Sequence, residues 1–184
     1  MINIFQKAFY GSSIKSLKFD PNSKLQVICK EAFLRSSIEA ISFPSQLVNL
    51  KKGWCRWAYN ITKVRVNPEN QRFKSFDDKF ILKKSSIGQA EYDSLIFCVR
   101  DIEAFTVQTF IKRISSFAFE GCSLLKNIDI PDDSKLQSIG REAFSETSIE
   151  SITFPSNLIE LQYGSCKNVR KLNDIKISPN NPRY

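Results

Sequence analysis

The chain of 184 residues contains no histidine. Histidine is the usual proton carrier near neutral pH and a frequent zinc ligand. Its absence excludes Ser-His-Asp and Cys-His nucleophile arrangements and every His-containing zinc site. No other set of side chains supplies an acid, a base and a nucleophile together, so we expect no enzymatic activity and no small-molecule substrate.

Glycine is scarce, with six residues, and their spacing forms neither a GxGxxG nor a Walker motif. A phosphate-binding loop is therefore excluded. The five cysteines contain no C-x-x-C pair, which argues against structural zinc. We expect no metal and no cofactor. The cysteines are interpreted as small packing residues; a redox or disulfide role is the alternative, although their odd number argues against complete pairing.

Long apolar runs are also absent. No stretch of about 18 uncharged apolar residues exists, so no spanning helix or direct membrane insertion is expected. The first residues lack the basic-then-apolar layout of a signal peptide. The hydrophobic fraction of 42% suffices for one continuous core, which predicts a single elongated domain over 1–184.

What the chain does contain is a repeat. Residues 23–73 align without a gap to residues 134–184, at an offset of about 111 residues and with roughly 22 of about 51 positions identical. Because Tyr184 corresponds to Phe73, the chain stops inside its own pattern, which predicts a fragment or a truncated repeat protein.

A shorter period of about 22 to 25 residues lies within each copy, in the leucine-rich repeat range. Its clearest form is Ile139-x-x-x-Ala143-Phe144 followed by Ile149-x-x-Ile152-x-Phe154-Pro155. The last two apolar residues are two apart and face the same side of a strand. Units of this kind bury their apolar side only by stacking, so the pattern predicts a solenoid with a parallel sheet on the concave face and short helices or turns on the other.

The period predicts seven strands, which lie near Leu17–Phe19, Ile41–Phe43, Val64–Val66, Phe105–Val107, Ile128–Ile130, Ile152–Phe154 and Ile175–Ile177. Residues 67–104 exceed one period and form an irregular region. Two apolar runs there flank the polar segment 85–93, which predicts one inserted β-hairpin over about residues 73–99, projecting from the solenoid. The acidic pairs Asp77-Asp78 and Asp132-Asp133 are interpreted as turn residues.

The chain is basic, with a formal net charge of +8. The densest cluster is 51–57, where two tryptophans lie among lysines and arginines. Such interleaving is compatible with nucleic-acid binding, but the copy at 162–168 has no tryptophan. We therefore interpret the tryptophans as core residues with solvated lysines around them, and nucleic acid as a disfavoured partner. Asn60-Ile61-Thr62 is a glycosylation sequon, which makes Asn60 a possible glycosylation site.

The segments 114–131 and 136–155 resemble the BspA-like (Treponema-type) leucine-rich repeat. The resemblance covers nearly the whole chain and departs from the pattern at Trp54-Cys55 and Ser165-Cys166, where the Ala-Phe pair is missing. It implies a leucine-rich repeat surface antigen or adhesin that attaches to host cells, matrix or other microbes, located at the cell surface or outside the cell, with no enzymatic activity.

A ligand on the concave sheet would contact the outward strand positions. These residues are small or polar, and the predicted ligand face consists of Lys18, Ser42, Lys63, Arg65, Thr106, Asp129, Thr153 and Lys176, with Ser16, Ala40, Ala104, Asn127, Ser151 and Asp174 beside them. The same residues would otherwise only solvate the sheet. The first hypothesis is a non-catalytic module that binds a protein or glycan ligand of a host or neighbouring cell. The alternative is an intracellular protein–protein interaction scaffold, cytoplasmic, which the missing signal peptide and the odd number of thiols favour.

Overall fold

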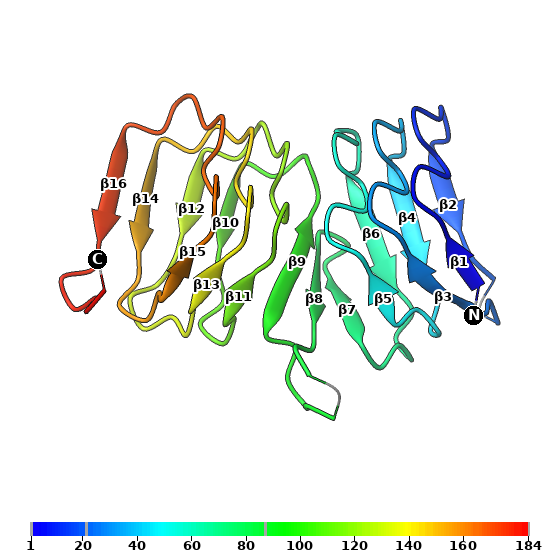
Figure 1. Cartoon of the computed structure of the whole chain (residues 1–184), viewed down its shortest axis with the longest axis horizontal. Coiled ribbons are helices and arrows are strands. Elements are labelled where there is room, and N and C mark those ends of the chain that lie inside the picture. The colour runs from blue at the N-terminus through cyan, green and yellow to red at the C-terminus, as the bar shows by residue number, and fades with distance from the viewer. Residues whose placement is uncertain (1, 21, 87, 184) are drawn as a thin grey trace.

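A computed structural model describes residues 2–20, 22–86 and 88–183. The chain winds as a solenoid of short strands joined by tight turns, with the N-terminal and C-terminal ends at opposite ends of the long axis (Figure 1). Strands stacked from one turn of the chain to the next form separate rows along this axis. The predicted repeat solenoid is therefore confirmed.

The first row contains the seven strands that the sequence predicts. They are β2 (Ser16–Lys18), β4 (Ala40–Phe43), β6 (Lys63–Val66), β10 (Ala104–Thr106), β12 (Asn127–Asp129), β14 (Ser151–Phe154) and β16 (Asp174–Ile177). The pairs β2–β4, β4–β6, β10–β12 and β14–β16 are all parallel. Alternate residues such as Ile41, Val64 and Ile152 are buried, as the spacing of the repeat requires.

A second row of strands forms another wall of the solenoid. The sequence predicted only one of these strands, the run near residue 94. The second row comprises β1 (Ile2–Ile4), β3 (Leu25–Ile28), β5 (Asn49–Leu50), β9 (Ser94–Cys98), β11 (Arg113–Ile114), β13 (Ser138–Ile139) and β15 (Glu160–Leu161). The first three pair in parallel, and so do the last four. Each turn of the solenoid therefore contributes a strand to two walls.

The Ala-Phe segments form the third side as turns, and the described residues contain no helix. The short helices that the sequence allowed do not form, because residues such as Glu31 (φ 60°) and Glu142 (φ 52°) adopt left-handed backbone. The amides also bond to the next turn of the solenoid, not to their own chain four residues back: the Phe33 amide donates to the Trp54 carbonyl at 2.9 Å.

The insertion differs from the predicted projecting hairpin. Strands β7 (Phe73–Phe76) and β8 (Phe80–Lys83) form an antiparallel hairpin, and β8 pairs in turn with β9. Since β9 pairs in parallel with β11, all three strands extend the second row into one sheet of six, and only the loop between β8 and β9 extends away from it (Figure 1). Asp77 (φ 51°) and Asp78 (φ 55°) form the hairpin turn, which confirms their interpretation as turn residues.

The insertion divides the hydrophobic core into two clusters of buried residues. Aromatic rings follow the same division. One series runs from Phe9 through Phe33 and Trp54, with ring centroids 4.8 and 5.7 Å apart. Another joins Phe119 to Phe144 at 5.4 Å. The interpretation of residues 1–184 as one domain stays a prediction.

Two asparagines at the same repeat position close the ends of the first-row strands. The amide nitrogen of Asn70 donates to the carbonyls of Pro44, Ser45 and Leu47 at 2.9–3.0 Å. Asn181 donates in the same way to Pro155 and Leu158. Tyr184, from which the sequence predicted an interrupted repeat, lies outside the described residues. Within the described chain, nothing forms a helix of the length and apolarity that a bilayer crossing requires.

Candidate functional site

The strand register assembles the predicted ligand face in the predicted order. Lys18, Ser42 and Arg65 are paired positions on β2, β4 and β6. Farther along the row, Thr106 pairs with Asp129 and Thr153 pairs with Lys176. Ser42 is partly exposed, and the other seven positions of the predicted site, Lys63 among them, are exposed. The structure therefore brings these residues together within neighbouring strands, while their role in binding stays a prediction.

The strongest positive charge of this face is already compensated. Asp78 at the tip of the hairpin accepts hydrogen bonds from Arg65 at 2.8 Å, and its Oδ2 lies 3.4 Å from Lys63 Nζ. The bond from Arg65 lowers the pKa of the Asp78 carboxyl. At the far end, Lys176 lies 3.2 Å from Asp174. The face is therefore polar and nearly balanced in charge, and none of the outward positions named above is aromatic.

The hairpin tip also occupies a fixed place beside the face. The Val64 amide donates to the Asp78 carbonyl at 2.8 Å, so the tip covers the edge of β6 on the side toward β10. The sequence analysis did not anticipate this contact, because it placed the insertion outside the solenoid. The predicted face is consequently divided into a part on β2, β4 and β6 and a part on β10, β12, β14 and β16.

The basic cluster that contains the tryptophans is explained by packing. Trp54 is 3% exposed and its ring meets Phe33 and Phe43 edge to face. Trp57 is half-buried between the guanidinium groups of Arg35 and Arg56, 4.8 and 5.0 Å from its ring centroid. The interpretation of Trp54 as a core residue is confirmed. The ring of Trp57 is only half-buried, and it makes cation–π contacts with both arginines.

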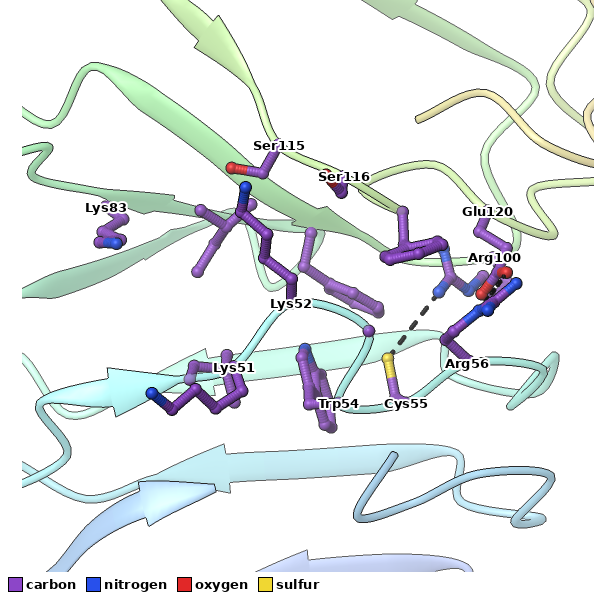
Figure 2. Close-up of a pocket in the computed structure, with 15 residues that line it drawn as sticks. Lys51, Lys52, Trp54, Cys55, Arg56, Lys83, Arg100, Ser115, Ser116 and Glu120 are labelled. Atoms are coloured by element: carbon purple, nitrogen blue, oxygen red, sulfur yellow. Dashed lines mark hydrogen bonds and ion pairs between the residues drawn. The ribbon is translucent and has the colours of Figure 1, made fainter. Parts of the chain in front are cut away.

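A pocket lies where the two halves of the core meet (Figure 2). Its floor includes Arg100, which is 5% exposed and donates to the Cys98 carbonyl and toward the sulfur atoms of Cys122 and Cys55. Burial raises the pKa of the Cys55 thiol to about 12. A buried thiol of this kind is protonated at neutral pH and unreactive.

An ion-pair network closes the pocket on its outer side. Arg56 reaches across the junction to Glu120 and to Glu142, each at 2.9 Å, and the two carboxylates are 1% and 2% exposed. Burial raises the pKa of Glu120, while the charge of Arg56 acts in the opposite direction. Tyr59 adds a further contact, since its hydroxyl donates to Glu146 at 2.8 Å.

Sequence reasoning missed this network, although the repeat contains a signal for it. Arg56 aligns with Lys167 in the second copy, and Lys167 lies 3.8 Å from the same carboxylate of Glu142. A basic residue at this repeat position thus reaches toward an acidic residue on an adjacent turn in both copies.

Two other sequence expectations concern chemistry at single residues. Asn60 is exposed in the turn before β6, so its side chain is accessible, and its glycosylation stays a prediction. In the described part of the chain, no three cysteine, aspartate or glutamate side chains converge as a metal site would require. The absence of a metal or cofactor in the functioning protein also stays a prediction.

Comparison with protein families shows a match to the BspA type leucine rich repeat region, with six copies over residues 1–86 and 90–183. The chain belongs to this BspA-type leucine-rich repeat family. The resemblance stated from the sequence is thereby confirmed. No curated protein matches the chain.

Solved structures of bacterial leucine-rich repeat proteins share the fold. A leucine-rich repeat protein from Eubacterium ventriosum superposes with a TM-score of 0.81 at 19% identity, over 95% of this chain and 44% of that protein. The pneumococcal vaccine antigen PcpA gives 0.76 at 22% identity, over 95% and 48%. A leucine rich cell surface protein from Faecalibacterium prausnitzii gives 0.62 at 15% identity, over 93% and 62%. The chain thus spans between 44% and 62% of the length of these proteins.

Proposed function

We propose that this leucine-rich repeat chain is a non-catalytic binding module of a surface antigen or adhesin, which attaches to a protein or glycan on a host cell, matrix or neighbouring microbe. The observation that carries the proposal is the predicted ligand face. Small and polar side chains follow one another along the seven strands, exposed or partly exposed, and strand pairing holds them in register within β2–β4–β6, within β10–β12 and within β14–β16. Parallel walls of this kind give repeat proteins their extended binding surfaces.

The face favours weak binding per molecule. It lacks the tryptophan, tyrosine and unpaired arginine anchors that dominate tight interfaces, because Arg65 is held by Asp78. Useful attachment would then depend on many copies acting together. A location at the cell surface is part of the proposal; its support is the family match together with the printed descriptions of two neighbours as a vaccine antigen and a cell surface protein.

The test uses the recombinant chain displayed at high density on beads, with binding to host cells and to matrix proteins as the readout. A face variant carries Thr106→Arg and Thr153→Arg, which place two bulky charges in the middle of the row. The matched control carries Thr109→Arg and Ser123→Arg, at exposed positions outside the strands. Loss of binding in the face variant alone supports the proposal. Absence of binding by the unmodified chain at every density refutes it, and equal binding by both variants removes the face as the site.

A second function, an intracellular interaction scaffold, is favoured by one observation: all five cysteines are free thiols. Reduced thiols are the normal state in the cytosol. Surface labelling of intact source cells with an antibody to the segment 73–99, with permeabilised cells as the control, separates the two functions. Signal on intact cells supports the adhesin, whereas signal only after permeabilisation supports the scaffold.

A further inference from the structure

The second row carries a group of cations that the proposed ligand face does not include. Lys83 on β8 pairs with Ser94 on β9, Ser94 pairs with Arg113 on β11, and Arg113 pairs with Ser138 on β13. Since adjacent strands lie about 4.8 Å apart, the backbones of Lys83 and Arg113 are separated by roughly 10 Å with Ser94 between them. The two long side chains can therefore reach toward one small group above Ser94.

Lys52, from the loop after β5, completes the arrangement. It lines a polar pocket together with Lys83 and Arg113. The remaining wall is mostly hydroxyl and amide groups, and it consists of Ser85, Ser94, Ser115, Ser116, Ser138 and Gln162, with Glu160 at the β15 side and Ile114 and Gly140 between them in the sequence. In Figure 2 the side chain of Lys52 extends toward Ser115, and Lys83 lies on the same side of the junction.

The protein compensates the charge of these cations only partly, through the carboxylate of Glu160 in the same pocket and the charge of Asp93 acting on Lys83. None of the ion pairs within residues 2–20, 22–86 and 88–183 involves Lys52, Lys83 or Arg113. The nearest buried acid, Asp93, is already engaged by the hydroxyl groups of Ser85 and Ser94. This arrangement contrasts with the first row, where Asp78 neutralises its arginine.

Burial and the neighbouring cations both disfavour the charged form of Lys83. Burial lowers the pKa of Lys83, and the positive charges of Arg72, Lys52 and Arg113 lower it further, while Asp93 acts in the opposite direction. An anion placed among these side chains would relieve the repulsion and form charge-assisted hydrogen bonds to each of them.

The lining of the pocket indicates what carries the anion. It contains no phenylalanine, tyrosine or tryptophan, so it offers no ring on which a nucleic-acid base would stack. Toward β13 and β15 it presents Ser138, Gln162 and Glu160, which are the kinds of groups that bond to sugar hydroxyls. A charged end beside a hydroxyl-binding end suits a sulfate ester attached to a sugar.

We propose that this pocket between Lys52, Lys83 and Arg113 binds a sulfate group of a sulfated polysaccharide. The site lies on a different wall from the predicted ligand face, so it is independent of the proposed attachment through that face. It assigns a ligand class to a cluster of cations that form no salt bridge within the described part of the chain.

The test measures the affinity of the whole chain for heparin, a sulfated polysaccharide, by calorimetry at physiological salt. The variant Lys52→Gln/Arg113→Gln removes two of the three cations, and both positions are exposed. The matched control, Lys126→Gln/Lys171→Gln, makes the same change in net charge at exposed positions outside the pocket. We expect the pocket variant to bind heparin about tenfold or more weakly, because two charge-assisted contacts are lost, and the control to stay within about twofold.

Chemically desulfated heparin and a single-stranded oligonucleotide complete the design. We expect neither to bind in the pocket. No heparin binding by the unmodified chain, equal weakening in both double variants, or undiminished binding of desulfated heparin would each overturn the proposal. Binding of the oligonucleotide that is lost in the pocket variant would assign the site to phosphate and overturn the sulfate assignment.

A third variant separates binding from folding. Lys83→Met removes the central cation but keeps the side chain that packs beside the sheet. Because the folded protein already disfavours the charge at this position, we expect its urea midpoint to be unchanged or higher, while heparin binding falls by about tenfold. A normal urea midpoint with full heparin affinity would overturn the proposal.

Discussion

Replacing Arg56 tests how the two halves of the solenoid are held together. The Arg56→Met variant keeps an unbranched side chain of similar length and removes the guanidinium that contacts Glu120 and Glu142, each at 2.9 Å. Glu142 keeps Arg141 at 3.0 Å, so the residue left without a partner is Glu120. One oxygen of Glu120, Oε2, is already buried with no hydrogen-bond partner among the described residues.

The expected loss follows from that orphaned carboxylate. Removing one partner of a buried ion pair costs about 3–5 kcal/mol of the free energy of unfolding, because the remaining charge stays buried. Urea unfolding followed by circular dichroism measures it. The control is Arg35→Met, which also stacks on Trp57 at 4.8 Å but is absent from the ion pairs of the described chain. Loss of one exposed cation–π contact costs about 0.5–1 kcal/mol.

The pH dependence gives an independent check. Burial holds the pKa of Glu120 in the folded protein above the ordinary value of a glutamate, so the folded state binds this proton more readily than the unfolded state. Stability from this group is therefore present at low pH and is lost as the pH rises through the folded pKa. Without Arg56 that pKa rises further, so the deficit of the variant is largest at pH 7 and shrinks toward pH 5.

A second substitution completes the cycle. In Arg56→Met/Glu120→Gln the buried charge is gone, and we expect most of the lost stability to return. A deficit in Arg56→Met below about 1 kcal/mol, as for an exposed pair, or one that does not change with pH, would refute the reasoning that Glu120 is an ionised group stabilised across the junction.

Three further predictions concern packing and reactivity. Gly140→Ala is expected to lower the free energy of unfolding in urea by about 3 kcal/mol, because its Cβ would overlap the backbone of the preceding turn. Gly11→Ala is the comparison: it has open space around it and is expected to lose only about 1 kcal/mol, because its backbone is left-handed. Asn70→Ala is expected to lose about 3 kcal/mol or more by the same assay, since two buried carbonyls and one partly buried carbonyl lose their donor. In the folded protein at pH 8, iodoacetamide should label the partly exposed Cys29 and leave Cys55 unmodified, because burial raises the pKa of Cys55 to about 12. Mass spectrometry measures the labelling, and equal labelling rates for the two cysteines would contradict the burial of the Cys55 thiol.

The strands of the first row were predictable because the same types of residue recur at the same spacing in each repeat. In each clear unit two apolar residues lie two apart and a proline follows, as in Ile152, Phe154 and Pro155. The spacing indicates a half-buried strand, and the proline indicates where the strand ends. The outward positions between them follow from alternation alone. Alternation therefore predicts which residues of the row point outward, and strand pairing brings Lys18, Ser42 and Arg65 side by side, while their role in binding stays a prediction.

The second row was not predictable by the same means. Its later strands are only two residues long, such as Arg113–Ile114 and Ser138–Ile139, and two residues show no alternation. These strands form because neighbouring turns of the solenoid align their backbones. They therefore depend on how the turns stack and not on the local sequence of each strand. Of the two alternatives for the Ala-Phe segments, turns form and helices do not for a related reason, since these segments satisfy amides on the next turn of the solenoid.

The junction was missed because its contacts join residues far apart in the chain. Arg56 lies 64 residues from Glu120 and 86 from Glu142. Their meeting requires that the turn containing Arg56 pack against the turn containing Glu120, which happens only because the insertion routes the chain through β7, β8 and β9. Gly121 permits this approach, since a Cβ there would lie 2.7 Å from the ring of Tyr59.

The buried charged residues of the described chain, Asp93, Arg100, Glu120 and Glu142, therefore lie at or beside the junction, and the physical reason is general. Inside a regular solenoid each turn buries its apolar residues against an equivalent turn, and few polar groups are needed. At the junction the rings of one aromatic series end at Trp54 and Phe97, so unlike turns meet and the gap is closed by Arg56, its two carboxylates and Arg100. On the same junction, the cations around Lys83 form no salt bridge among the described residues, although Glu160 lines their pocket. A departure from the repeat thus requires polar groups to stabilise the core where unlike turns meet. It also places the three cations of the proposed sulfate site together, and for this reason the interruption matters to the proposed binding as much as the regular face does.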